Sequence, residues 1–302
     1  MRGKVYETNL FFLLVIIITI IGSLILEFFP EGMVQELFQY VCILIPALLY
    51  VYFKRRSFKE TLKLNSISIK NIILVVFLTF AIQPFIVLVG TVADIIFKNQ
   101  CELLFGDLES YSIWFALFGT ALTPAICEEV LLRGVILDGY RGMSIKKAVI
   151  MNGFLFGIFH MNLFQFSYTF FIGIILALIV YYTNSIYASI IMHFLNNALS
   201  VVVTKFPNSF YARLEDNLYR TETITQVVLM VVLALISIIV SYLIIKAIAR
   251  TSKNEGVYTR YVVSNDLIVK EKVFNWPLVV SFIIFLLMSL LIAVAASLNG
   301  LM

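Results

Sequence analysis

One stretch of this chain runs for 57 residues, from Ala148 to Thr204, without a single Asp, Glu, Lys or Arg. A helix of that length would measure roughly 85 Å, which is enough for about three crossings of a bilayer joined by tight turns. The segments "MNLFQFS" (161–167) and "YTNSIY" (182–187) carry polar residues at which such crossings can end. The run therefore predicts a helical bundle embedded in a membrane.

The rest of the chain follows the same pattern. A transmembrane helix needs about 20 apolar residues. Uncharged runs of about this length occur at Thr8–Leu26, Leu37–Phe53, Asn71–Ala93, Ser110–Cys127, Thr223–Ile245 and Val273–Met302. Only 13% of the residues are charged, against about 25% in a soluble domain. We predict an all-α, polytopic transmembrane helix bundle of eight to nine spans, forming a single integral membrane domain over 1–302.

Basic residues predict the orientation of this bundle. With a cytoplasmic N-terminus, 17 of the 22 Lys and Arg residues lie in the N-terminal segment and the loops on that side, among them Lys63, and four lie on the other side. Cytoplasmic loops carry such an excess. We expect the longest polar loop, 250–272, to be a solvated connector, and the net charge of +4 gives no reason to expect a nucleic acid partner. Cys42, Cys101 and Cys127 are too few for a disulfide framework and are predicted to pack as small residues.

Charges interrupt the apolar pattern at "TPAICEEVLLRG" (123–134), which holds Glu128, Glu129 and Arg133. The two histidines of the chain, His160 and His193, both lie in the 57-residue uncharged run. Ionisable groups at membrane depth are costly, so they are candidates for function. These five residues are therefore the first candidates for a site.

Helical spacing allows the candidates to meet. Glu129 and Arg133 are four residues apart and can pair on one face, whereas Glu128 is rotated from them by about 100°. His193 and Asn197 are also four residues apart and share a stripe of their helix.

Depth along the predicted spans supports the same grouping. Glu128 lies about 14 Å from the cytoplasmic end of its helix, His160 roughly 20 Å and His193 less than about 10 Å. All three can meet in the cytoplasmic half of the bilayer. Pro124 lacks an amide hydrogen and frees a backbone carbonyl one turn before the glutamates, a break typical of helices beside a buried cavity.

This set of side chains suits the hydrolysis of a peptide bond. A carboxylate and an imidazole can hold and deprotonate a water that attacks a carbonyl carbon. A histidine and a carboxamide can then stabilise the oxyanion. The same set can bind a divalent metal such as zinc, with Glu128, His160 and His193 as the candidate ligands. We find no serine or cysteine in a setting typical of a nucleophile.

These segments resemble three motifs of the CPBP family of intramembrane proteases, named after CAAX proteases and bacteriocin-processing proteins and also called Abi. "EEVLLRG" is similar to its EExxxR motif, "FGIFH" to FxxxH, and "SIYASIIMHFLNN" carries HxxxN, in the same order and spacing. The resemblance covers about 111–203, the catalytic core of the family. One departure is Leu132, where the family usually has an aromatic residue.

The resemblance implies a membrane endopeptidase whose catalytic core occupies the central four helices, with a cavity open to the cytoplasmic side. Glu128 with His160 would activate the water, and His193 with Asn197 would stabilise the oxyanion. The paired Glu129 and Arg133 would support and orient the site, and Glu129 can share the role of base.

The resemblance also bears on cofactors and partners. Family members are often labelled metalloproteases, whereas similar eukaryotic-type CAAX enzymes use a glutamate-activated water without an obligatory metal. We expect no required cofactor, while a divalent metal such as zinc stays open. The expected partners are the bilayer and a membrane-embedded or lipidated peptide, at the cell membrane.

Other classes of function fit parts of the pattern. A transporter also buries carboxylates and histidines, but it predicts repeated halves, which the sequence does not show. A non-catalytic bacteriocin-immunity or scaffold protein would be marked by decayed motifs, whereas every motif position is filled. A prenylated CAAX peptide is one candidate substrate; the processing of a leader or signalling peptide in a bacterial cell is favoured over it.

Overall fold

The computed structural model of this protein describes residues 4–29, 37–97, 111–209, 212–213, 223–256 and 271–298. Every regular element within these ranges is a helix. Seven helices are long and apolar enough to cross a bilayer: Lys4–Leu26, Ile69–Phe97, Ile113–Gly139, Leu163–Thr183, Ile186–Lys205, Ile224–Asn254 and Trp276–Ser297. The protein is a multi-pass, all-α membrane protein, as its sequence predicts.

Two further predicted segments are helical but short. The helix Leu37–Phe53 is one, and α11 (Ile145–Phe159) is the other. With 15 residues, α11 measures about 22 Å, less than the hydrocarbon core of about 30 Å. The count of eight to nine spans therefore stays a prediction.

Both expected breaks in the long uncharged run are confirmed. Helix α11 ends before α12 (Leu163–Thr183), and α12 ends before α13 (Ile186–Lys205). The side chain of Asn162 accepts a hydrogen bond from the Gln165 amide and caps the start of α12. Asn184 ends α12 in the left-handed conformation, at φ 49°, which asparagine tolerates better than most residues. Polar turn residues thus mark the helix ends, which the apolar pattern alone does not locate.

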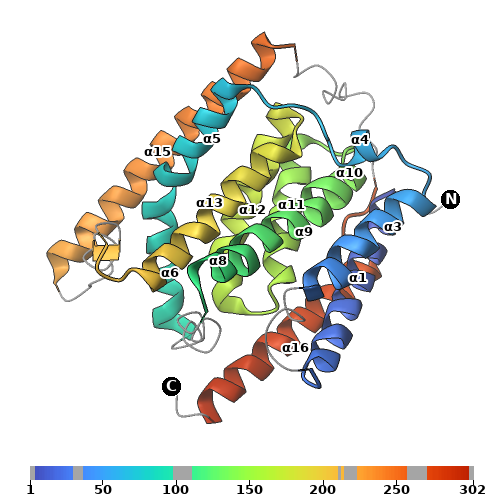
Figure 1. The fold of residues 1–302 in the computed structure, drawn as a ribbon, viewed down its shortest axis with the longest axis horizontal. Helices are drawn as coiled ribbons and strands as arrows, with labels where there is room; N and C mark the ends of the chain where they lie inside the picture. Colours follow the sequence, from blue (N-terminus) through green and yellow to red (C-terminus); the bar gives the residue numbers. More distant parts are fainter. Residues whose placement is uncertain are drawn as a thin grey trace.

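The centre of the bundle is one bent helix packed against α11, α12 and α13 (Figure 1). It runs from 113 to 139 through α8 (Ile113–Ala116), α9 (Thr123–Glu129) and α10 (Leu137–Gly139). Two π-helical segments, Leu117–Leu122 and Val130–Ile136, join these parts. We call the whole of 113–139 the active-site helix, after the candidate residues Glu128, Glu129 and Arg133 that it carries.

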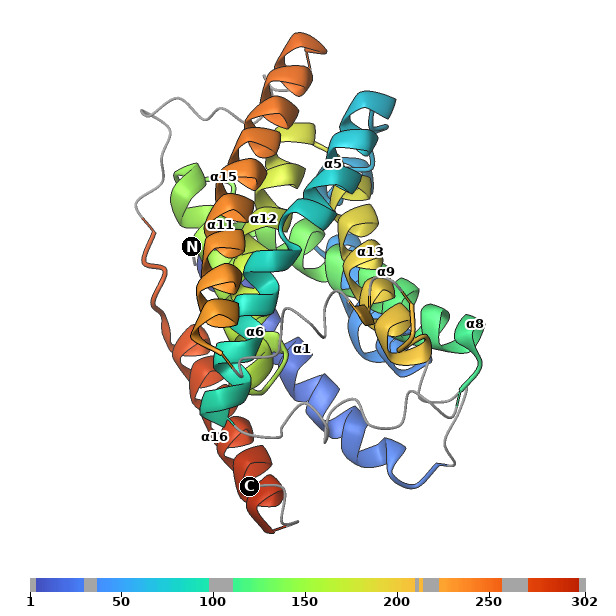
Figure 2. The same cartoon turned by 90° about the vertical axis from the view of Figure 1, so that its left-hand side faces the viewer.

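Two groups of helices flank this centre. On one side α15 runs beside α5 and α6, as Figure 2 also shows. On the other side α1 packs against α16 and the active-site helix. The bounds are α5 (Ile69–Ala81), α6 (Gln83–Phe97) and α15 (Ile224–Asn254) for the first group, and α1 (Lys4–Leu26), α3 (Ile45–Phe53) and α16 (Trp276–Leu298) for the second.

One predicted helix end is confirmed and one is wrong. The active-site helix continues past the uncharged run to Gly139, in agreement with the prediction that Glu128 lies about 14 Å from the end of its helix, and the charges of Glu129 and Arg133 neutralise each other inside it. Helix α15 continues past Ile245 to Asn254, because Ile248 is buried against the bundle. The remainder of the predicted polar loop, 257–270, lies outside the described residues.

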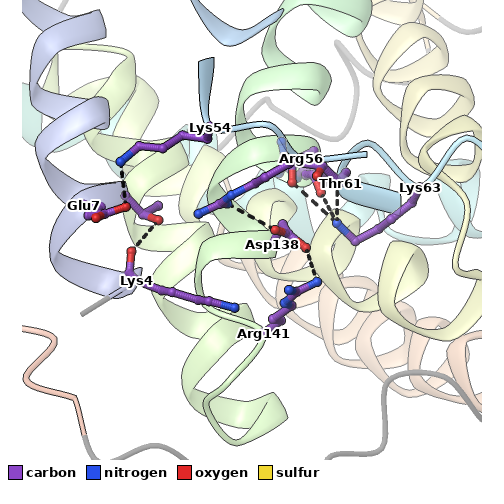
Figure 3. A network of polar contacts seen from close by, with 11 residues as sticks. Lys4, Glu7, Lys54, Arg56, Thr61, Lys63, Asp138 and Arg141 are labelled. Atoms are coloured by element: carbon purple, nitrogen blue, oxygen red, sulfur yellow. Dashed lines mark hydrogen bonds and ion pairs between the residues drawn. The ribbon is translucent and has the colours of Figure 1, made fainter. Parts of the chain in front are cut away.

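Three segments predicted to share the cytoplasmic side meet in a network of polar contacts (Figure 3). Lys54 Nζ lies 2.8 Å from a carboxylate oxygen of Glu7. Asp138 accepts from Arg56 at 3.3 Å and from Arg141 at 3.2 Å. The first residues of α1, the loop after α3 and the end of the active-site helix therefore meet, as the charge pattern requires. Which side of the membrane they face stays a prediction.

The packing of α11 on α12 depends on a close backbone approach at Gly153. A Cβ atom at this position would lie 2.7 Å from the Phe170 carbonyl oxygen and 3.0 Å from the Ile174 nitrogen. Since backbone cannot move aside as a side chain can, we expect Gly153→Ala to destabilise the bundle by about 1–3 kcal/mol, measured by thermal unfolding in detergent.

Gly22→Ala is the matched control for that substitution. Its Cβ would meet only side-chain atoms of Cys42 and Phe38, which can adjust. A melting temperature that falls as much for Gly22→Ala as for Gly153→Ala would show that the backbone approach is not the cause.

Candidate active site

The two glutamates lie at the junction of α9 with the second π-helical segment. A π-helical turn widens the helix by one residue and is frequent at functional sites. Glu129 is completely buried, whereas the side chain of Glu128 is 13% exposed. Adjacent carboxylates on one helix thus occupy different environments, as their predicted 100° rotation requires.

Glu129 connects two partners through one oxygen. Its Oε1 accepts from Arg133 Nη1 at 2.7 Å and from His193 Nδ1 at 2.8 Å. A carboxylate only accepts, so His193 Nδ1 carries a hydrogen. The predicted pairing of Glu129 with Arg133 is confirmed, and the structure adds that the pair holds an imidazole.

Arg133 is fully buried and contacted on several sides. Besides Glu129, it donates to the Gly173 carbonyl of α12 at 3.3 Å. Its guanidinium carbon lies 4.3 Å from the centre of the Phe156 ring, a distance typical of a cation–π contact. A buried charge needs such compensation, so Arg133 fixes the active-site helix relative to α11 and α12.

Glu128 lies next to His193 without a hydrogen bond to it. Its Oε2 is 3.9 Å from His193 Nε2, beyond hydrogen-bonding distance. This oxygen is buried and has no partner among the described residues. A buried carboxylate oxygen without a partner is unusual, and it leaves Glu128 free to bind a further group.

His160 follows the last residue of α11 and joins the same cluster. Its Nδ1 lies 2.9 Å from the Phe156 carbonyl oxygen, which can only accept, so Nδ1 is the protonated nitrogen and Nε2 is free. The Phe156 ring packs edge-on against His160, at 4.9 Å, and His193, at 5.7 Å. The Phe156 ring therefore contacts both histidines and lies in the same cluster.

Asn197 meets the active-site helix one turn further along α13. Its Nδ2 donates to the carbonyl of Thr120 at 3.1 Å. Thr120 is four residues before Pro124, so this carbonyl is the one whose α-helical donor proline lacks. The carbonyl that the sequence predicts to be free is thus bound by the amide predicted to stabilise an oxyanion.

Several residues around this cluster are not among the candidates predicted from the sequence. Asn152 is completely buried in α11 and donates to the Leu132 carbonyl at 2.8 Å. The Tyr40 and Thr123 hydroxyls lie 3.2 Å apart and join the helix 37–53 to the active-site helix. Asn152 carried a signal, because it is a polar residue within the uncharged run, but nothing in the sequence pairs Tyr40 with Thr123.

Lys63, one of the predicted loop cations, is buried beneath the site. Only 3% of it is exposed. Its Nζ donates to the carbonyls of Arg133 at 2.8 Å and Thr61 at 3.2 Å (Figure 3). The π-helical turn leaves such carbonyls available, so the buried ammonium stabilises the backbone beneath the site.

This burial predicts a pH dependence of stability. Desolvation lowers the pKa of Lys63 to about 8, although the Asp138 carboxylate acts to raise it. In the unfolded chain the lysine holds its proton to about pH 10.4. Between these values the unfolded state binds more protons, so stability rises with pH, by at most about 1.4 kcal/mol per unit.

We therefore expect the melting temperature of the wild type to rise relative to that of Lys63→Met as the pH goes from 7.5 to 9.5. The comparison cancels the titration of the other groups, because both proteins share them. A difference that stays constant over this range would show that the Lys63 amine does not titrate there.

Metal binding by Glu128, His160 and His193 stays a prediction. Among the described residues the structure shows no group of three or more His, Cys, Asp or Glu side chains placed to hold a metal ion. Nδ1 of His193 contacts Glu129 and Nδ1 of His160 contacts a backbone carbonyl, which leaves Nε2 of each ring as the nitrogen that could bind a further group. Cys42 and Cys127 are free and buried, as predicted, while Cys101 lies outside the described residues.

Comparison with known proteins supports the family resemblance. Residues 110–199 match the family model described as type II CAAX prenyl endopeptidase, Rce1-like. No curated protein and no solved structure matches the chain. The matched segment includes every candidate residue from Glu128 to Asn197 and nearly coincides with the predicted core, 111–203.

Proposed function

We propose that this chain, whose residues 110–199 resemble a CAAX-type intramembrane protease, is an active endopeptidase that hydrolyses a peptide bond with a glutamate-activated water. The observation that carries the proposal is the position of Glu128. Its side chain is 13% exposed, accepts no hydrogen bond from the described residues, and places Oε2 3.9 Å from an imidazole nitrogen of His193. Glu129 differs because it is completely buried and its Oε1 accepts from both Arg133 and His193, although its Oε2 also lacks a partner among the described residues.

Glu128 is the proposed base, with His160 as its helper. Both of them present an acceptor: the free Oε2 of Glu128 and the Nε2 of His160, whose Nδ1 is bound to a backbone carbonyl. A water between two acceptors directs a hydrogen to each and a lone pair towards the substrate. Glu129 is less suited to this role because it is completely buried and Arg133 and His193 share its Oε1, although its Oε2 has no partner among the described residues.

His193 and Asn197 are the proposed oxyanion donors. When His193 holds a hydrogen on each ring nitrogen, Nδ1 donates to Glu129 and Nε2 can donate to the oxyanion. The Asn197 amide has two hydrogens and donates one to the Thr120 carbonyl, so the second can be donated to the oxyanion.

The proposed reaction uses these groups in sequence. Glu128 takes a proton from the water as the water oxygen forms a bond to the scissile carbonyl carbon. The oxyanion accepts from His193 Nε2 and Asn197 Nδ2. Glu128 then gives the proton to the amide nitrogen, the C–N bond breaks, and an acid and an amine leave.

The orientation and the substrate complete the proposal. We place the N-terminus and the polar end of the bundle in the cytoplasm of the cell membrane, so the site opens towards the cytoplasmic half of the bilayer. The substrate class is a membrane-embedded or lipidated peptide. A bacterial leader or signalling peptide, including one from bacteriocin processing, is preferred to a prenylated CAAX end.

The test is a cleavage assay on the full chain in detergent. Wild type and His160→Ala are incubated with quenched-fluorescent hydrophobic peptides, some with farnesylated CAAX ends, with and without chelator. We expect cleavage by wild type, at least about 10²-fold less by His160→Ala, and no effect of the chelator.

Each outcome separates the alternatives. Cleavage that persists in His160→Ala contradicts the proposed site, and loss on chelation makes the enzyme metal-dependent. A scaffold or immunity protein of the same fold would cleave none of the peptides, including membrane-anchored ones presented in vesicles.

A further inference from the structure

Three side-chain amides form a line of hydrogen bonds across α13, from the start of α6 to the active-site helix. Gln83 Nε2 donates to Asn196 Oδ1 at 3.2 Å, and Asn197 Nδ2 donates to the Thr120 carbonyl at 3.1 Å. Between them, Asn196 Nδ2 lies 3.5 Å from Asn197 Oδ1, the longest contact of the line. The proposed mechanism uses only Asn197 and gives no role to the side chains of Gln83 and Asn196.

The two ends of the line determine its direction. Gln83 Nε2 also donates to the Thr79 carbonyl at 2.8 Å, and the other end is the Thr120 carbonyl. A backbone carbonyl only accepts, so nitrogen must face it at both ends. With Gln83 donating to Asn196, only one orientation of each asparagine lets every contact join a donor to an acceptor.

The position of Gln83 explains why it can begin the line. Helix α5 ends at Ala81 and α6 begins at Gln83, directly before Pro84. Pro84 has no amide hydrogen to donate within this turn, and the side chain of Gln83 binds the Thr79 carbonyl near the end of α5. Gln83 is thus held by α5 and donates its second hydrogen to α13.

The orientation of Asn197 matters for the proposed chemistry. Turned by 180°, its amide would point an oxygen at the Thr120 carbonyl and offer an acceptor, not a donor, to the developing oxyanion. Donors that are already oriented contribute most to transition-state stabilisation, because the protein does not reorganise during the reaction.

We propose that Gln83 is a positioning residue that holds the Asn197 amide, through Asn196, with its N–H groups towards the active-site helix. This proposal rests on the proposed function. Gln83 lies outside the segment 110–199 that matches the protease family.

The first test is a double-mutant cycle on peptide cleavage. We expect Asn197→Ala to lower kcat about 100-fold and Gln83→Leu about 10-fold, with KM within twofold, since the loss is confined to the transition state. The double variant should be no worse than Asn197→Ala alone, because Gln83 acts through Asn197. Losses that multiply, or an unchanged kcat for Gln83→Leu, would overturn the proposal.

Asn71→Leu is the matched control for a general loss of packing. Asn71 is a buried amide on the adjoining α5, and it donates to Ser252 of α15 at 3.1 Å. The same kind of substitution should lower the melting temperature while leaving kcat unchanged. If kcat falls as far as in Gln83→Leu, the effect of Gln83 is structural.

A second test does not depend on activity. In protein labelled with ¹⁵N-asparagine, the side-chain amide signals of Asn197 are identified by their loss in Asn197→Ala. They should shift in Gln83→Leu and stay in place in Asn71→Leu. Unchanged signals in Gln83→Leu would overturn the proposal whether or not the protein cleaves peptides, whereas cleavage that survives Asn197→Ala would contradict only the proposed function.

Discussion

Replacing Glu128 with Gln is expected to lower kcat for peptide cleavage by about 10²–10⁴-fold, the usual contribution of a general base. The amide keeps the shape of the carboxylate but cannot take a proton from water. Stability should change little, because Glu128 Oε2 has no hydrogen-bond partner to lose among the described residues. The measurements are kcat and the melting temperature in the same detergent.

Glu129→Gln is the matched control, since it makes the same change one residue along the helix. Glu129 is fully buried and holds both Arg133 and His193, so this variant should melt at a lower temperature. If Glu129→Gln keeps its fold and loses all activity while Glu128→Gln remains active, the base is Glu129, not Glu128.

Replacing Arg133 with Met is expected to destabilise the protein by about 3–5 kcal/mol, the cost of leaving a buried charge without its partner. The side chain removed is completely buried and contacts Glu129, the Gly173 carbonyl and the Phe156 ring. Methionine fills much of the volume but leaves Glu129 with His193 alone. Thermal unfolding in detergent and the yield of folded protein measure the loss.

Arg141→Met provides the comparison at the polar end of the bundle. Its ion pair with Asp138 is 3.2 Å long and its own side chain is 44% exposed, while Arg56 stays paired with the buried Asp138 carboxylate, so the expected cost is about 0–1 kcal/mol. The double variant Glu129→Gln with Arg133→Met should recover part of the stability, because neither charge is then left alone. If Arg133→Met and Arg141→Met have the same melting temperature, the buried pair Glu129–Arg133 contributes no more to stability than the pair Arg141–Asp138.

The helices were predictable because lipid leaves few alternatives. Backbone groups in hydrocarbon must bond within their own segment, so an uncharged run of sufficient length is a helix, and all nine predicted segments are helical where the structure describes them. The pairing of Glu129 with Arg133 was predictable for a similar reason, since helical spacing puts residues i and i+4 together.

Contacts between distant segments were not predictable in this way. The hydrogen bond between Glu129 and His193 joins residues that are 64 positions apart in sequence. The one between Gln83 and Asn196 joins residues that are 113 positions apart. The burial of Lys63 depends on carbonyls of the active-site helix, 70 residues away in sequence. The periodicity of apolar residues does not predict such pairings, because it indicates only which face of a helix is apolar.

The sequence by itself determined which residues are helical, which of them cannot face lipid, and that the few ionisable groups at membrane depth belong together. It did so through the cost of a charge or an unbonded backbone group in hydrocarbon. Only the tertiary structure decided how the two adjacent glutamates differ. Packing buries Glu129 completely, with its Oε1 bound to Arg133 and His193, and leaves the Glu128 side chain 13% exposed and without a hydrogen-bond partner among the described residues. This difference depends on where α11, α12 and α13 lie around the active-site helix.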